Sequence, residues 1–165
     1  MMHVAVQTED FDVSAVLAAL RAENPAIGAV VSFVGLVRDL NEGQQVRTME
    51  LEHYPGMTEK SLQMIADKAA QQWNLMGGVI LHRVGALKPL DQIVMVAVAS
   101  AHRGEAFAAC EFMMDYLKTE APFWKKESTP EGEKWVDARD SDEQAMAKWA
   151  HVMGACDGYV HDECV

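Results

Sequence analysis

The sequence has few positive charges and no long hydrophobic run. Its 165 residues include 14 lysine and arginine against 25 aspartate and glutamate residues, a formal net charge of −11. An acidic chain lacks the basic face that binds a phosphate backbone, and an anionic membrane surface repels it. No apolar run approaches the length of about 20 residues that spans a bilayer, and the N-terminus does not resemble a signal peptide. We therefore expect a cytoplasmic protein that binds neither nucleic acid nor membrane.

Cysteines are also few. Cys110, Cys156 and Cys164 are odd in number and have no metal-ligand spacing, which argues against a disulfide framework. His151 and His161 accompany two of them near the C-terminus, but this spacing matches no common zinc pattern. GxGxxG, P-loop lysine and GxSxG motifs are absent. We therefore predict reduced thiols, no metal site and no cofactor.

The composition is that of a globular domain, with 50% hydrophobic and 24% charged residues. Apolar patterning predicts strands over 2–7, 28–37, 46–53, 79–84, 93–99 and 134–137, and helices after Asp12, Thr58, Arg103 and Ser141. Strands occur in adjacent pairs between single helices, so the pattern predicts an α+β domain with a mainly antiparallel sheet flanked by helices. We expect the 28–37 and 46–53 strands to form a hairpin. The predicted domain covers 1–150, and 151–165 is a tail of unknown role.

Cationic side chains gather around one predicted helix of this acidic chain. His102 and Arg103 lie at a strand-to-helix junction, where the helix N-terminus attracts anions. Lys118 lies in the last turn, Pro122 prevents further helix, and Lys125 follows on a predicted loop. This chain reversal brings both lysines toward one cleft, which indicates a pocket for a small anion or an acyl group. Each residue taken alone is more typical of a solvated turn or helix end than of a functional site.

Apolar residues accompany these cations. Phe107, Cys110 and Leu117 are expected on one apolar face of the helix. Phe123 and Trp124, between the lysines, form either a packed anchor or a pocket wall, and packing is favoured.

Lysines close to an arginine lower each other's pKa, which suits them to Schiff-base formation, proton donation or oxyanion stabilisation. Two other functions remain open from the residues alone. One is a non-catalytic module that only binds an anion. The other is a small hydrolase of phosphate or acyl esters, although the sequence offers no nucleophile with a recognisable activating partner.

Several long motifs closely resemble the large, catalytic subunit of molybdopterin synthase. They are GAVVSFVGLVRD at 28–39, LEHYPGMTEKSL at 51–62, HRVGALKPLDQIV at 82–94, SAHR at 100–103, MDYLKTEAPFWKKE at 114–127 and TPEGEKWVDAR at 129–139. The resemblance implies an α/β-hammerhead fold and a sulfurtransferase of molybdenum cofactor biosynthesis. A small ubiquitin-like carrier subunit would supply sulfur as a C-terminal thiocarboxylate, and cyclic pyranopterin monophosphate would receive it to form the molybdopterin dithiolene. The resemblance also implies a homodimer within a heterotetramer.

Position by position, the resemblance assigns site residues. Lys118 and Lys125 match catalytic positions, and Arg139 matches a residue that reaches the pocket across the dimer. The usual family form has lysine at the position of Leu36. The implied substrate-binding residues are Leu36, Val37, Arg38, His102, Arg103, Lys118, Lys125, Lys126, Glu127 and Arg139.

Overall fold

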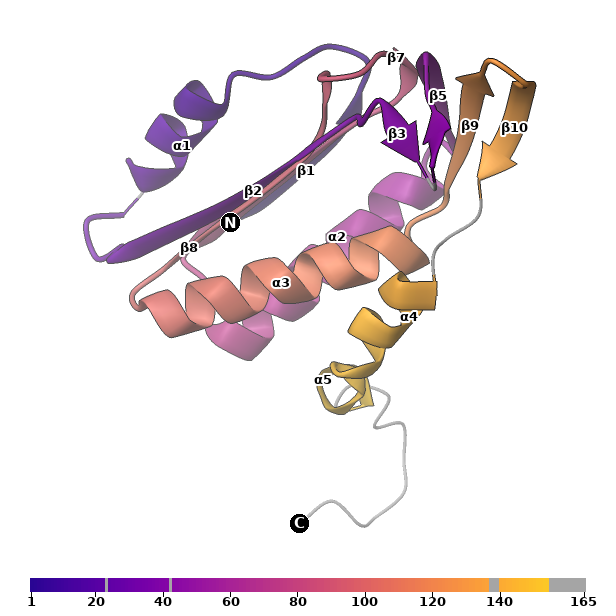
Figure 1. Cartoon of the computed structure of the whole chain (residues 1–165). Coiled ribbons are helices and arrows are strands. Elements are labelled where there is room, and N and C mark those ends of the chain that lie inside the picture. Colours follow the sequence, from indigo (N-terminus) through magenta and orange to yellow (C-terminus); the bar gives the residue numbers. More distant parts are fainter. Residues whose placement is uncertain (23, 42, 137–139, 155–165) are drawn as a thin grey trace.

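The computed structural model describes residues 1–22, 24–41, 43–136 and 140–154. Its larger sheet has the strand order β1-β6-β8-β2 and lies between helices (Figure 1). β1 pairs in parallel with β6, whereas the β6–β8 and β8–β2 pairs are antiparallel. The strands are β1 Met2–Gln7, β6 Gly77–Arg83, β8 Gln92–Ser100 and β2 Ala29–Leu36.

A second sheet, entirely antiparallel, stands at one end of the first, with the order β10-β9-β5-β7 (Figure 1). Its strands are β10 Gly132–Val136, β9 Phe123–Thr129, β5 Thr48–His53 and β7 Gly85–Leu87. A two-stranded ladder joins β3 Leu40–Asn41 to β4 Gln44–Gln45.

The helices are α1 Val13–Arg21, α2 Met57–Trp73, α3 Arg103–Glu120, α4 Asp140–Ala147 and α5 Ala150–Gly154. Local chemistry explains their ends. The Asp12 carboxylate accepts a hydrogen bond from the Ala15 amide at 3.0 Å and caps α1. The Glu59 carboxylate accepts one from the Gly56 amide at 2.6 Å at the start of α2.

Strand β8 is buried on both faces, because α2 and α3 cover one side of the sheet and α1 covers the other (Figure 1). Successive side chains of a strand point to opposite faces. Val94, Val96 and Val98 therefore join the core beneath α2 and α3, whereas Met95 and Ala97 pack toward α1. This explains why the strand reads as a continuous apolar run rather than an alternating one.

Helix α4 is held against α3 by polar contacts. The Trp149 indole, directly after α4, donates from Nε1 to Asp115 Oδ2 at 2.6 Å, and its ring contacts Trp73 and Phe112 edge-on. Lys148 forms ion pairs with Glu111 and Asp115. These contacts fix the C-terminal end of α4 beside the middle of α3.

The predicted α+β fold with mainly antiparallel pairing is confirmed. The predicted hairpin is wrong, because β2 pairs with β8 in the larger sheet and β5 pairs with β7 and β9 in the smaller one. Lys125 lies in strand β9 and not on a loop. Phe107 does not belong to the buried face of α3, since 62% of its surface is exposed. The assignment of 1–150 as one domain stays a prediction, and most of the predicted tail falls outside the described residues.

Gly28, just before β2, and Gly104, in the first turn of α3, differ in the space around them. A Cβ at Gly28 would lie 2.3 Å from the Ala101 carbonyl oxygen, whereas a Cβ at Gly104 would meet nothing within 4 Å. We therefore expect Gly28→Ala to lower the free energy of unfolding by about 1–3 kcal/mol, since backbone must move. Gly104→Ala, in the first turn of α3, should leave it unchanged or raise it by up to about 1 kcal/mol.

Urea unfolding of both variants measures this difference. Equal destabilisation by the two substitutions would show that the contact of Gly28 with the Ala101 carbonyl does not limit the position.

Candidate functional site

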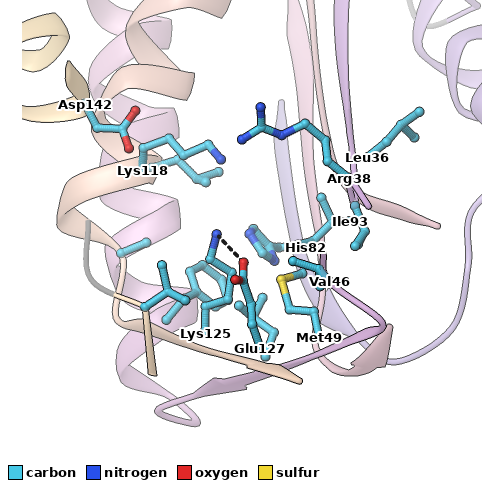
Figure 2. Close-up of a pocket in the computed structure, with 16 residues that line it drawn as sticks. Leu36, Arg38, Val46, Met49, His82, Ile93, Lys118, Lys125, Glu127 and Asp142 are labelled. Carbon is cyan, nitrogen blue, oxygen red and sulfur yellow. Dashed lines mark ion pairs between the residues drawn. The ribbon is translucent and has the colours of Figure 1, made fainter. Parts of the chain in front are cut away.

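A cavity of about 370 Å³ opens where the two sheets meet the C-terminal end of α3. Residues from both sheets and from two helices line it (Figure 2). The lining residues are Leu36, Val37, Arg38, Val46, Met49, Leu51, His82, Ile93, Leu117, Lys118, Ala121, Phe123, Lys125, Glu127, Val136 and Asp142.

The end of β2 supplies one wall of the cavity. Pairing between β2 and β8 shifts register between Gly35 and Leu36, and the chain then leaves the regular ladder. Val37 stays anchored, because its amide donates to the Asp91 carbonyl at 2.9 Å and its side chain is buried. This anchor directs Arg38 toward the cavity, while Leu36 remains 51% exposed at its edge.

The turn from α3 into β9 places the two predicted catalytic lysines around the same cavity. Lys118 lies in the last turn of α3, and Pro122 lies between that helix and β9. The Thr58 hydroxyl, fully buried at the start of α2, donates to the Pro122 carbonyl at 3.0 Å. Figure 2 shows Lys118 and Arg38 extending toward each other from opposite walls.

The charged side chains of β9 alternate between the two faces of the strand. Lys125 and Glu127 face the cavity, with 3.8 Å between Lys125 Nζ and Glu127 Oε1, and Glu127 is only 3% exposed. Lys126 lies between them in the strand and forms a 2.7 Å ion pair with Glu133 on β10. Trp124 is also outside the cavity and 48% exposed.

The cavity has a local excess of positive charge within an acidic protein. Arg38, Lys118 and Lys125 supply three cations, and Glu127 and Asp142 supply two carboxylates. Water is partly excluded from such a cavity, so each charge acts more strongly than on an open surface. The geometry suits an anionic ligand held at several points, with a lysine fixed by a buried carboxylate beside it.

His82 forms part of the cavity although the sequence did not mark it as a site residue. It is 5% exposed, and its ring stacks on Phe123 with 3.8 Å between the ring centroids and 19° between the planes. Burial lowers the pKa of His82 from 6.5 to about 4, and the nearby Lys118 and His53 act in the same direction. The imidazole is therefore neutral at physiological pH.

Comparison with known proteins identifies the family of this chain. The family model described as MoaE protein matches residues 6–120. The molybdopterin synthase catalytic subunit of Ralstonia nicotianae is 64% identical over 92% of this chain and 86% of its own length. The chain belongs to the MoaE protein family.

Solved structures of similar proteins agree with this family. The Burkholderia ambifaria MoaE protein has a TM-score of 0.79 and 62% identity, covering 91% of this chain and 99% of its own. A complex of subunits 1 and 2 of the Helicobacter pylori molybdopterin-converting factor has a TM-score of 0.63 at 19% identity, over 84% and 90% of the two chains. The likeness to the second structure concerns the fold alone.

The family comparison confirms the prediction of a molybdopterin synthase catalytic subunit. Six predicted MoaE site residues share the cavity, and three others do not line it. The residues of the cavity are Leu36, Val37, Arg38, Lys118, Lys125 and Glu127; His102, Arg103 and Lys126 lie elsewhere. Arg139 lies outside the described residues.

His102 and Arg103 lie at the far end of α3 from Lys118. His102 is the N-cap of the helix, and Lys118 is fifteen residues after Arg103. At a rise of about 1.5 Å per residue, Arg103 and Lys118 are separated by about 22 Å along the helix axis. One copy of the chain therefore does not bring these residues to a common ligand.

No cysteine of the described ranges lines the cavity. Cys110 is buried in the core, where burial raises the pKa of its thiol to about 11. Among the described residues, no group of three or more potential metal ligands is close enough to hold an ion. No helix in the described ranges is long and apolar enough to cross a membrane.

The lowered pKa of His82 makes a testable contribution to acid sensitivity. In the unfolded chain this histidine takes up a proton near pH 6.5, whereas in the folded chain it does so only near pH 4. Its contribution to stability is thus present above pH 6.5 and is lost as the pH falls toward 4. We expect the stability difference between the wild type and His82→Gln to shrink by about 2 kcal/mol between about pH 7 and about pH 4.5.

Urea unfolding at a series of pH values gives this difference. The other histidines cancel in the comparison. A constant difference across the series would mean that the folded protein protonates His82 as readily as the unfolded chain does.

Proposed function

We propose that this chain transfers sulfur from the C-terminal thiocarboxylate of a small ubiquitin-like carrier to cyclic pyranopterin monophosphate, forming the molybdopterin dithiolene. The observation that carries the proposal is the cavity at the end of α3, where Arg38, Lys118 and Lys125 converge from three elements. Both partners of the reaction are anionic, since one carries a phosphate and the other a thiocarboxylate. Membership of the MoaE protein family supports the same reaction.

In this reaction the thiocarboxylate sulfur bonds to a pterin carbon, and a bond from that carbon to oxygen breaks. Water then cleaves the bond between sulfur and the acyl carbon, which leaves the carrier with a C-terminal carboxylate. Two such transfers, one at each carbon, make the dithiolene. Lys118 stabilises the charge that develops on the acyl oxygen, as a fixed cation does in an oxyanion site. Lys125 transfers a proton to or from the reacting atoms. The adjacent Glu127 carboxylate keeps the Lys125 amine in place. Arg38, on the opposite wall, holds the phosphate.

The carrier supplies sulfur, and among the described residues no thiol lines the cavity. The nearest described cysteine by sequence, Cys110, is buried and has a raised pKa, so it is a poor nucleophile. An extended C-terminal tail reaches a recessed cavity more easily than a folded domain does. The exposed Leu36 at the edge offers this tail an apolar contact. The similar protein of Ralstonia nicotianae is named a catalytic subunit, which supports a further subunit as the partner.

A second copy of the chain completes the site. His102 and Arg103 suit a phosphate because they stand at the N-terminal end of α3, where helix amides and the dipole favour anions. The separation of about 22 Å from Lys118 means that they reach a cavity only on another protomer. We therefore assign the active enzyme as a homodimer, with two carriers making a heterotetramer, in the cytoplasm.

The two cavity lysines and their neighbour in β9 provide a matched test. With a thiocarboxylated carrier and the pterin substrate, we expect Lys118→Ala and Lys125→Ala each to lower turnover by about a hundredfold or more. Lys126→Ala should change turnover by about twofold at most, because its ion pair with Glu133 is on the other side of the strand. Formation of the dithiolene product measures turnover, and thermal unfolding verifies the fold.

Equal losses in all three variants would show that total charge, not placement, governs the activity. If the wild type makes no product with the carrier, or makes it as fast from free sulfide, the proposed reaction is wrong.

Mixing inactive variants tests the shared site. Lys118→Ala and Arg103→Ala should each be impaired alone. In a mixed dimer, one of the two sites would combine the intact Lys118 of one protomer with the intact Arg103 of its partner. After unfolding and refolding an equal mixture, we expect about a quarter of the wild-type activity, because half of the dimers are mixed and each has one complete site.

Refolding each variant alone is the control. A mixture no more active than the mean of the two separate variants would place Arg103 and Lys118 in different functions or in the same protomer's site.

A further inference from the structure

His82 lines the cavity, and one nitrogen atom of its ring has no hydrogen bond to the described residues. Its Nδ1 lies 2.8 Å from the backbone carbonyl oxygen of Arg83. A carbonyl oxygen only accepts hydrogen bonds, so Nδ1 carries the proton of the neutral ring. Nε2 is then an acceptor, and no side chain or backbone group of the described ranges donates to it.

Burial keeps this acceptor neutral, and charged groups around the cavity contribute to the effect. Burial is the main cause of the pKa of about 4, and Lys118 and His53 add to it, while the bond to the Arg83 carbonyl opposes it. Lys125 and Glu127 enter the cavity from β9, and Arg38 and Asp142 enter from the other walls. In Figure 2 the imidazole lies in the middle of this group, with Lys125 on one side and Ile93 on the other.

The position of the ring is fixed rather than adaptable. It is held by the stack on Phe123, by the hydrogen bond from Nδ1 and by its place in the central strand β6. Because His82 lines the cavity, a ligand that enters it can supply the hydrogen that Nε2 accepts.

We propose that His82 is a substrate-binding residue whose Nε2 accepts a hydrogen bond from an N–H group of the pterin heterocycle. This inference rests on the proposed function. The cations of the cavity satisfy a phosphate, but they donate hydrogen bonds and so cannot accept one from the N–H groups of the pterin. Of the carboxylates, Glu127 faces Lys125 and Asp142 extends beside Lys118. A neutral acceptor selects an N–H donor without adding negative charge near the phosphate.

Two substitutions separate the acceptor from the ring. His82→Phe keeps an aromatic ring to stack on Phe123 but removes the acceptor. His82→Gln loses the ring but presents an amide oxygen near the position of Nε2. We expect His82→Phe to bind cyclic pyranopterin monophosphate about tenfold more weakly, and His82→Gln to bind it within about threefold of the wild type.

Direct binding without the carrier, by calorimetry on the folded proteins, gives these affinities. Inorganic phosphate is the second probe, and all three proteins should bind it equally, whereas Arg38→Ala should bind both probes more weakly. If both variants fail to fold, the ¹⁵N resonances of His82 in the wild type give the answer. The Nε2 resonance should move on saturation with the pterin substrate but not with phosphate, and the Nδ1 resonance should stay in place.

Equal pterin binding by His82→Phe and the wild type would overturn the inference, as would an Nε2 resonance that the pterin leaves unchanged. The proposed function would survive either result, provided that the wild type converts the substrate. If the wild type does not bind the pterin substrate, both the inference and the proposed function fail.

Discussion

The hydrogen bond from the Thr58 hydroxyl to the Pro122 carbonyl fixes the turn on which the candidate site depends. It joins the start of α2 to the junction between α3 and β9, two regions far apart in the sequence. Because this junction is held, the last turn of α3 and the first residues of β9 present Lys118 and Lys125 to one cavity. Thr58 is fully buried and also accepts a hydrogen bond from the Tyr54 amide, so its hydroxyl is used twice.

From this turn, strand periodicity arranges the chemistry. Side chains two residues apart in β9 share a face, which pairs Lys125 with Glu127 in the cavity and directs Lys126 toward Glu133. Pairing with β5 on one side and β10 on the other prevents β9 from rotating this pattern. A buried carboxylate beside a lysine makes the amine's position, and not only its charge, a property of the fold.

The sequence predicted that Lys118 and Lys125 approach one cleft, because the signals for this arrangement are local. Lys118 lies at a predicted helix end, and the proline that follows it prevents further helix. The chain must therefore turn before Lys125. The incorrect hairpin has the opposite cause: adjacency in sequence suggested pairing, yet β2 is extended and apolar enough to join the buried β8 strand. His82 escaped notice because β6 is buried, and a histidine within an apolar strand gives no periodic signal that it lines a cavity.

The length of α3 links the fold to assembly. A helix that packs along the larger sheet keeps its two ends far apart (Figure 1). His102 and Arg103 lie at the N-terminal end, which attracts anions, and Lys118 lies near the other end. A shorter helix would place both groups on one ligand but would leave much of the β8 face uncovered. In the proposed dimer, the N-terminal cations of one protomer's α3 reach the lysines of its partner, because the long helix that covers the core keeps these groups about 22 Å apart within one protomer.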